Sequence, residues 1–98
     1  MLHIYIGIRM NSISNYTHEQ AKRLGVSVKP SRKIDKKLDV FRGGEFIGSI
    51  GSKGMGDFPT YLRTKGKKYA NERRRLYHIR QADGPKDSPA YLAKRLLW

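Results

Sequence analysis

Residues 58–80 read FPTYLRTKGKKYANERRRLYHIR and carry eight lysines and arginines against one acid, Glu72. From about residue 67 to residue 81, apolar side chains recur at helical spacing, which predicts a basic amphipathic helix; they are Tyr69, Ala70, Leu76 and Tyr77. Arg73 and Arg80 fall within this apolar face, where a guanidinium must meet an anion or reach water along its stem. The stretch therefore predicts an anionic partner.

The composition of the whole chain supports the same expectation. Its 98 residues suffice for a single domain, 1–98, and hydrophobic residues make up only 38% of it. The net charge of +13 would lead the free protein to seek phosphates or acidic protein surfaces. The chain contains no cysteine, which excludes disulfides, thiolate metal sites and cysteine nucleophiles.

Two segments of the single domain are distinguished by their sequence patterns. Residues 1–15 form an N-terminal strand or arm, since every second residue from Leu2 to Ile8 is apolar, and this strand could pair here or with a partner's sheet edge. The arm is too short to cross a bilayer, so no membrane insertion is expected. Residues 29–37 form a basic linker whose cations include Arg32, Lys33, Lys36 and Lys37.

A β-hairpin is predicted at about residues 38–51, because two strand-like segments flank Gly43 and Gly44, a pair suited to a tight turn with positive φ. Start and stop signals for short helices surround it: a capping box at Thr17 and Gln20, Asp57, and Ser88 with Pro89 as starts, and Gly25 and Gly66 as stops. The expected fold class is α+β, a small single domain in which short α-helices pack on the hairpin.

Three aromatic residues are candidates for partner anchors or for a lid on the core: Tyr69, Tyr77 and Trp98. We expect the last of them to close over the hairpin together with the C-terminal helix, residues 90–98.

Two motifs of nucleotide-binding or DNA-binding proteins fit the sequence less well. Residues 16–27, YTHEQAKRLGVS, have the pattern of a helix-turn-helix opening, but Pro30 would interrupt the recognition helix. Glycines around Lys53 suggest a phosphate loop, but the spacing of the P-loop motif is absent, so these glycines are better explained as backbone bends.

Over about residues 16–98 the chain resembles a family of small, basic, uncharacterised proteins encoded by large double-stranded DNA viruses and by some phages. The resemblance rests on four groups of residues: Lys36 to Phe41; Ile50-Gly51 with Asp57 to Tyr61; Arg73, Tyr77 and Arg80; and Leu96-Leu97-Trp98. The chain has Gln81 where this pattern has a histidine, so no role is assigned to that position. The resemblance implies a viral setting and no enzymatic activity.

An enzyme is not expected. The three histidines, His3, His18 and His78, lie in different segments, so a zinc-dependent nuclease would lack its paired ligands, and no metal site or cofactor is predicted. The candidate binding residues are the cations of the linker and the basic helix: Arg32, Lys33, Lys36, Lys37, Lys67, Lys68, Arg73, Arg74, Arg75 and Arg80.

Two non-enzymatic functions use these same residues. In the first, the protein is a minor capsid or cement component of the virion, and its arginines pair with acidic surfaces of larger viral structural proteins. In the second, it binds nucleic-acid phosphates without sequence specificity and serves in genome packaging. The expected location is the virion, with the host cytoplasm or nucleus before packaging.

Overall fold

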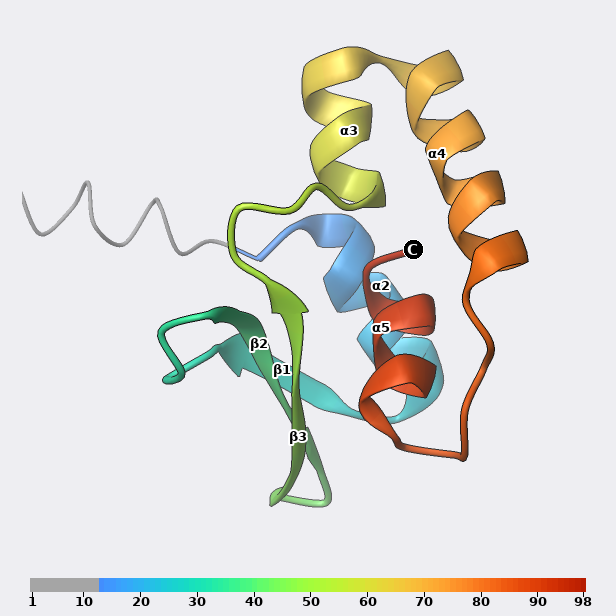
Figure 1. Ribbon diagram of the computed structural model, residues 1–98. Coiled ribbons are helices and arrows are strands. Elements are labelled where there is room, and N and C mark those ends of the chain that lie inside the picture. Colours follow the sequence, from blue (N-terminus) through green and yellow to red (C-terminus); the bar gives the residue numbers. More distant parts are fainter. Residues whose placement is uncertain (1–12) are drawn as a thin grey trace, which may run out of the picture.

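The computed structural model describes residues 13–98 (Figure 1), so the predicted N-terminal strand, up to residue 12, lies outside the described residues. The elements follow one another in this order: α2 (Asn15–Leu24), β1 (Ser27–Pro30), β2 (Lys36–Arg42), β3 (Glu45–Ser52), α3 (Phe58–Lys65), α4 (Lys67–Arg80) and α5 (Pro89–Leu96). The predicted α+β class is confirmed, because a small antiparallel sheet packs with short helices in one domain.

The predicted hairpin is formed by β2 and β3, which pair with Leu38 opposite Ile50 and Arg42 opposite Glu45. Gly43 and Gly44 make the turn with φ values of 60° and 83°, a left-handed backbone that glycine adopts without a steric penalty. A third strand, β1, pairs antiparallel with the other edge of β2, so the sheet has the order β1-β2-β3.

The segment predicted as a basic linker, residues 29–37, is instead the end of β1, a turn and the start of β2. The prediction was wrong because it was based on the many basic residues of the segment and did not take account of the buried Asp39. The carboxylate of Asp39 accepts hydrogen bonds from the Ser31 hydroxyl at 2.6 Å, the Ser49 hydroxyl at 2.7 Å and the Arg32 backbone N–H at 3.2 Å. These hydrogen bonds hold the turn against the sheet. They also offset the free-energy cost of burying the Asp39 carboxylate.

The hydrophobic core lies between the sheet and the helices α2 and α5. It consists of Ala21, Leu38, Val40, Ile50, Leu92, Leu96 and Leu97. The helix-turn-helix alternative is wrong, because the chain after Gly25 enters β1 and not a second helix. None of the helices between residues 13 and 98 has the length and apolar character that a bilayer crossing requires.

The predicted start and stop signals of the helices are correct except at the start of α2, and α5 ends at Leu96, before the predicted end at residue 98. Asp57 caps α3 by accepting from the Thr60 backbone N–H at 3.0 Å, and Ser88 caps α5. Gly25 and Gly66 end α2 and α3 as expected. The N-cap of α2 is Ser14 and not Thr17, and the Thr17 hydroxyl donates to the Leu96 carbonyl at 2.9 Å. A long-range hydrogen bond thus replaces the predicted capping box.

The helices α3 and α4 pack against each other as a helical hairpin that stands apart from the sheet (Figure 1). This pair is joined to the rest of the domain at the chain segment that follows α5. The Phe58 backbone N–H donates to the Leu97 carbonyl at 3.0 Å, and the rings of Phe58 and Tyr16 lie 5.0 Å apart. The basic helix, predicted at about 67–81, is therefore held by α3 and by the C-terminal segment and not by the hairpin of strands.

Candidate anion-binding site

The face of α4 that turns toward the domain contains two arginines. Ala70 is fully buried, and Arg73, Arg74 and Tyr77 are half-buried at the spacing of one helical face. The Arg74 guanidinium carbon lies 4.0 Å from the centre of the Phe58 ring, and that of Arg73 lies 5.7 Å from the centre of the Tyr61 ring. Both guanidiniums are accommodated on aromatic faces, as cation–π contacts allow.

This buried face is rotated toward Arg74 relative to the face predicted from the sequence. Arg80 and Tyr69 were placed within it, but Arg80 is exposed and Tyr69 lies at its edge with 42% of its surface exposed. The rotation follows from the aromatic rings of α3, which accept arginine as readily as an apolar side chain. A hydropathy pattern alone counts such an arginine as polar and misplaces the face.

The end of the chain is fixed by hydrogen bonds to its last four carbonyl groups. Those of Arg95 and Leu96 accept from the side chains of Gln20 and Thr17, both at 2.9 Å, that of Leu97 accepts from the Phe58 backbone N–H at 3.0 Å, and that of Trp98 accepts from the Tyr16 hydroxyl at 3.2 Å. Helix C-termini leave such carbonyls without intrahelical partners, so α2 and α3 act as the cap of α5.

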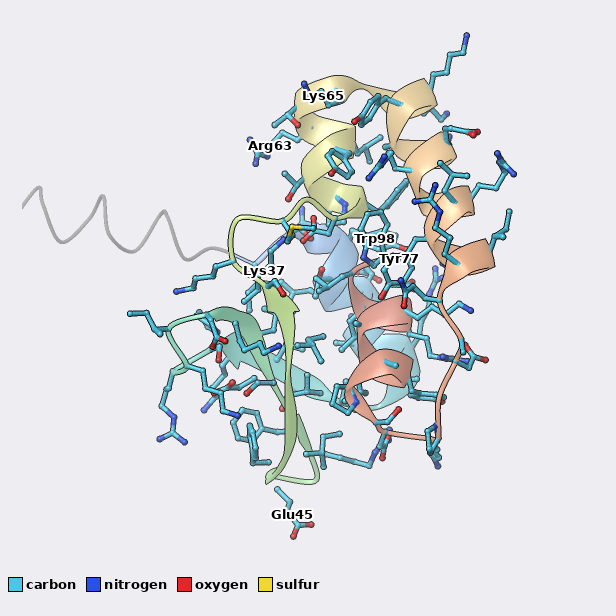
Figure 2. The ribbon with its side chains drawn as sticks, viewed as in Figure 1. Lys37, Glu45, Arg63, Lys65, Tyr77 and Trp98 are labelled. Atoms are coloured by element: carbon cyan, nitrogen blue, oxygen red, sulfur yellow. The ribbon has the colours of Figure 1, made fainter. Side chains whose placement is uncertain are left out.

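Trp98 is therefore held in place and meets α4. Its indole ring stacks on the Tyr77 ring with centroids 4.5 Å apart and an angle of 9° between the planes, and the two lie side by side in Figure 2. The Tyr61 ring lies 6.1 Å away, tilted by 52°. Trp98 and Tyr77 thus act as a lid within the protein. The predicted closure of Trp98 over the hairpin of strands is wrong, because Trp98 closes on α4.

Most of the positive charge is not neutralised within the protein. Of the 21 lysines and arginines, all but Arg9 lie in the described residues, and only six of these lie within 4.0 Å of a carboxylate: Arg32, Lys37, Arg42, Arg75, Lys94 and Arg95. Of the eight cations in residues 58–80, only Arg75 has such a partner, Glu72, at 2.6 Å. The hydrogen bonds from Arg75 lower the pKa of Glu72.

The candidate residues of the former linker do not join those of α4. The turn between β1 and β2, drawn in teal, and α4, drawn in orange, lie at opposite sides of the molecule (Figure 1). Arg32 and Lys33 are exposed in that turn, Lys36 is half-buried, and Lys37 is engaged by Asp57 at 2.8 Å. Lys37 is thus a structural cation, and the remaining candidate residues lie on two separate surfaces.

A groove of about 700 Å³ lies between α4 and the pair α2 and α5. We refer to it as the α4 groove, and its walls are formed by Tyr16, Gln20, Asn71, Arg74, Arg75, His78, Lys94, Arg95 and Trp98. The contribution of α2 and α5 was missed from the sequence, because these residues lie far from α4 along the chain. The only local signal was the adjacent pair Lys94-Arg95 in the C-terminal helix.

The described histidines, His18 and His78, are both exposed and lie on different helices, and His3 is outside the described residues. Within residues 13–98, no three histidine or acidic side chains gather as a metal-binding cluster.

Comparisons of the chain with protein-family models, with curated proteins and with solved structures find no match. The resemblance to small viral proteins stays a prediction from the sequence.

Proposed function

We propose that the protein is a non-enzymatic structural component of a virus particle, and that its helical hairpin docks on an acidic surface of a larger structural protein. The docking surface is the exposed part of α3 and α4, residues 58–80, which we call the basic hairpin. The viral setting is the one that the sequence resemblance implies. The docking itself is supported by the seven cations of the basic hairpin that have no carboxylate within 4.0 Å among the described residues.

Exposed apolar side chains on the basic hairpin favour a protein as the partner, and this observation carries the proposal. Leu62, Tyr69 and Ile79 expose 41%, 42% and 66% of their surface among the cations. Protein interfaces combine apolar and aromatic side chains with arginine, whereas a phosphate backbone offers no apolar surface to Leu62 or Ile79. Figure 2 shows Arg63 and Lys65 of α3 extending outward, where a partner could reach them.

A second candidate function is binding to nucleic-acid phosphates, as in genome packaging. The end of the hairpin where α3 meets α4 favours it, since Lys65, Lys67 and Lys68 are exposed there and none has a carboxylate partner in the part of the chain that the structure describes. Lysine is a point charge that attracts phosphates without geometric selectivity. Such binding would be independent of sequence and would weaken steeply with salt.

Two double variants separate these functions. Leu62→Ser with Ile79→Ser removes the exposed apolar surface, and we expect it to lower the occupancy of the protein on particles emptied of genome while leaving duplex DNA binding unchanged. Lys67→Gln with Lys68→Gln should weaken both. Ile34→Ser is the matched control, because Ile34 is 89% exposed but lies in the turn between β1 and β2.

Occupancy is measured as copy number per purified particle before and after genome release, and DNA binding as fluorescence anisotropy at two salt concentrations. Docking on protein predicts a fixed copy number after genome release and loss of duplex binding by about 0.2 M salt. Loss of the protein together with the genome, or tight duplex binding that persists at that salt, would overturn the docking function in favour of nucleic-acid binding.

A further inference from the structure

The α4 groove combines positive charge with aromatic surface and has no acidic side chain in its walls. Its permanent cations are Arg74, Arg75, Lys94 and Arg95, and its aromatic residues are Tyr16 and Trp98. At about 700 Å³ it has the size of a site for a small organic ligand. A ligand that fits these walls carries both an anionic group and a planar ring.

Arg74 is the groove cation best placed to bind such an anion. It has no carboxylate within 4.0 Å among residues 13–98, and its protein partners are neutral: the Phe58 ring at 4.0 Å and the Asn71 side-chain oxygen at 2.9 Å. These contacts orient the guanidinium without neutralising it. A guanidinium has five N–H donors, so donors remain for two parallel hydrogen bonds to a phosphate.

Each of the other three permanent cations has a carboxylate partner. The Arg95 guanidinium lies 3.8 Å from the centre of the Tyr91 ring and 3.3 Å from Asp83, and Lys94 also lies 3.3 Å from Asp83. Arg75 pairs with Glu72. Four permanent cations therefore face two carboxylates, and the remaining two positive charges match the charge of a phosphate monoester at neutral pH.

The aromatic residues of the groove are held by contacts within the protein. The Trp98 ring stacks on Tyr77, the Tyr16 ring lies 5.0 Å from that of Phe58, and the Tyr16 hydroxyl donates to the Trp98 carbonyl at 3.2 Å. Every nucleobase can stack on such rings, so this contact does not depend on which base is present. Preorganised rings and guanidiniums reduce the entropy lost when a ligand binds.

We propose that the α4 groove binds a nucleotide, with the phosphate on Arg74 beside Lys94 and Arg95 and the base against Tyr16 and Trp98. The nucleotide can be a free molecule or one unit of single-stranded nucleic acid, because both present the same phosphate and base. This site goes beyond the docking function, since its ligand is a small molecule or single strand and its walls are formed by α2 and α5 as well as by α4.

The chain has a single tryptophan, so Trp98 fluorescence reports on the groove without added labels. The wild-type protein is titrated with adenosine 5′-monophosphate, adenosine, inorganic phosphate, a short deoxyadenosine oligonucleotide and a short glutamate peptide at about 0.15 M salt. We expect saturable quenching by the nucleotide, and binding of adenosine or phosphate alone at least about tenfold weaker. An oligonucleotide that binds much more tightly than the nucleotide identifies the single strand as the natural ligand, and equal affinity per site identifies the free nucleotide.

The absence of saturable quenching by both nucleotide and oligonucleotide would overturn the proposal. So would equal binding of the glutamate peptide, because the groove would then select charge alone.

Three variants test the assignment of the phosphate to Arg74. Arg74→Gln should weaken nucleotide binding at least about tenfold, and Arg74→Lys should do so severalfold, because lysine keeps the charge but loses the planar fork. Lys33→Gln is the matched control, exposed in the distant turn, and should leave the affinity within about twofold. Circular dichroism confirms that each variant is folded. Nucleotide affinity that Arg74→Gln leaves unchanged would refute the site.

The nucleotide site and the docking function can be refuted independently of each other. Lys67→Gln with Lys68→Gln, which weakens docking, leaves the nucleotide affinity within about twofold if the α4 groove is the site. A parallel loss of both activities would show that they share one diffuse basic surface and would overturn the nucleotide site.

Discussion

The indole of Trp98 stacks face to face on the phenol ring of Tyr77, with 4.5 Å between centroids and 9° between planes. This contact joins the last residue of the described chain to the last turn of α4. It adds to the packing of α4 on α3, where Ala70 is buried, the Arg74 guanidinium lies on the Phe58 ring and the Tyr69 ring lies 5.2 Å from that of Tyr61. The position of the cations on α4 therefore depends in part on this aromatic pair.

Replacing Trp98 with alanine should lower the free energy of unfolding by roughly 2 kcal/mol, less than for a fully buried tryptophan, because Trp98 is only half-buried. We expect α4 to lose protection against hydrogen exchange before the sheet does. Urea unfolding and exchange rates measure the two effects. Phe46→Ala is the control, since Phe46 also pairs with an aromatic ring, Phe41 at 5.8 Å, but is 47% exposed on the hairpin of strands. A control that costs as much stability as Trp98→Ala would show that the terminal stack has no special role.

Replacing Thr17 with valine should destabilise the protein by about 1–3 kcal/mol, because the Leu96 carbonyl, which accepts the buried Thr17 hydroxyl at 2.9 Å, would lose its donor. Thr64→Val is a matched control, since the Thr64 hydroxyl also donates to a carbonyl, that of Thr60, but is exposed to water. We expect less than about 0.5 kcal/mol there. Equal urea midpoints for the two variants would contradict the capping role of Thr17.

Local signals in the sequence predicted the features that depend on neighbouring residues. The Asp57 cap, the glycine at the end of α2 and the Gly43-Gly44 turn are each decided by the backbone within a few residues, so they were predicted correctly. The same local reasoning assigned Thr17 to a capping box, because it cannot see the Leu96 carbonyl 79 positions away. Propensity gives no information on such long-range partners.

The candidate site was predicted only in part, because long-range partners again decide which of its residues are available to bind a ligand. The charge of residues 58–80 is visible in the sequence, but whether a cation is free depends on the acids that folding brings to it. Lys37 and Lys67 look alike in the sequence, yet only Lys37 meets a carboxylate, that of Asp57. The α4 groove was not predicted, since Gln20 and Arg95 are brought to α4 only by the packing of three helices.

Replacing Lys37 with methionine should reduce stability and not anion binding. The Lys37 amino group lies 2.8 Å from the carboxylate of Asp57, a buried residue that also caps α3, so its removal leaves a buried charge without its cation. We expect a loss of roughly 1–3 kcal/mol in the free energy of unfolding. Lys33→Met, at an exposed position of the turn between β1 and β2, should leave stability within about 0.5 kcal/mol. If Lys37→Met unfolds at the same urea concentration as the wild type, the ion pair does not contribute to the free energy of unfolding. Lys37 would then again be a candidate anion-binding residue.

The protein should lose stability in acid through Asp39. Burial alone would raise the pKa of Asp39, but hydrogen bonds from Ser31, Ser49 and the Arg32 backbone outweigh it and lower the pKa below its ordinary value. The unfolded chain therefore binds the proton more readily, so the stability that ionised Asp39 contributes is complete above about pH 4 and is lost as the pH falls through its lowered pKa.

Asp39→Asn tests this origin of the acid sensitivity. Asparagine does not titrate, so the variant should be less stable than the wild type near pH 7 but should lose less further stability between about pH 5 and pH 3. Asp35→Asn is the control, because Asp35 is exposed in the same turn and its carboxylate has no hydrogen bond within residues 13–98. Urea unfolding at a series of pH values gives the slope for each protein. If Asp39→Asn loses stability in acid as steeply as the wild type, other carboxylates cause the decline, and the network around Asp39 stabilises the turn through its hydrogen bonds alone.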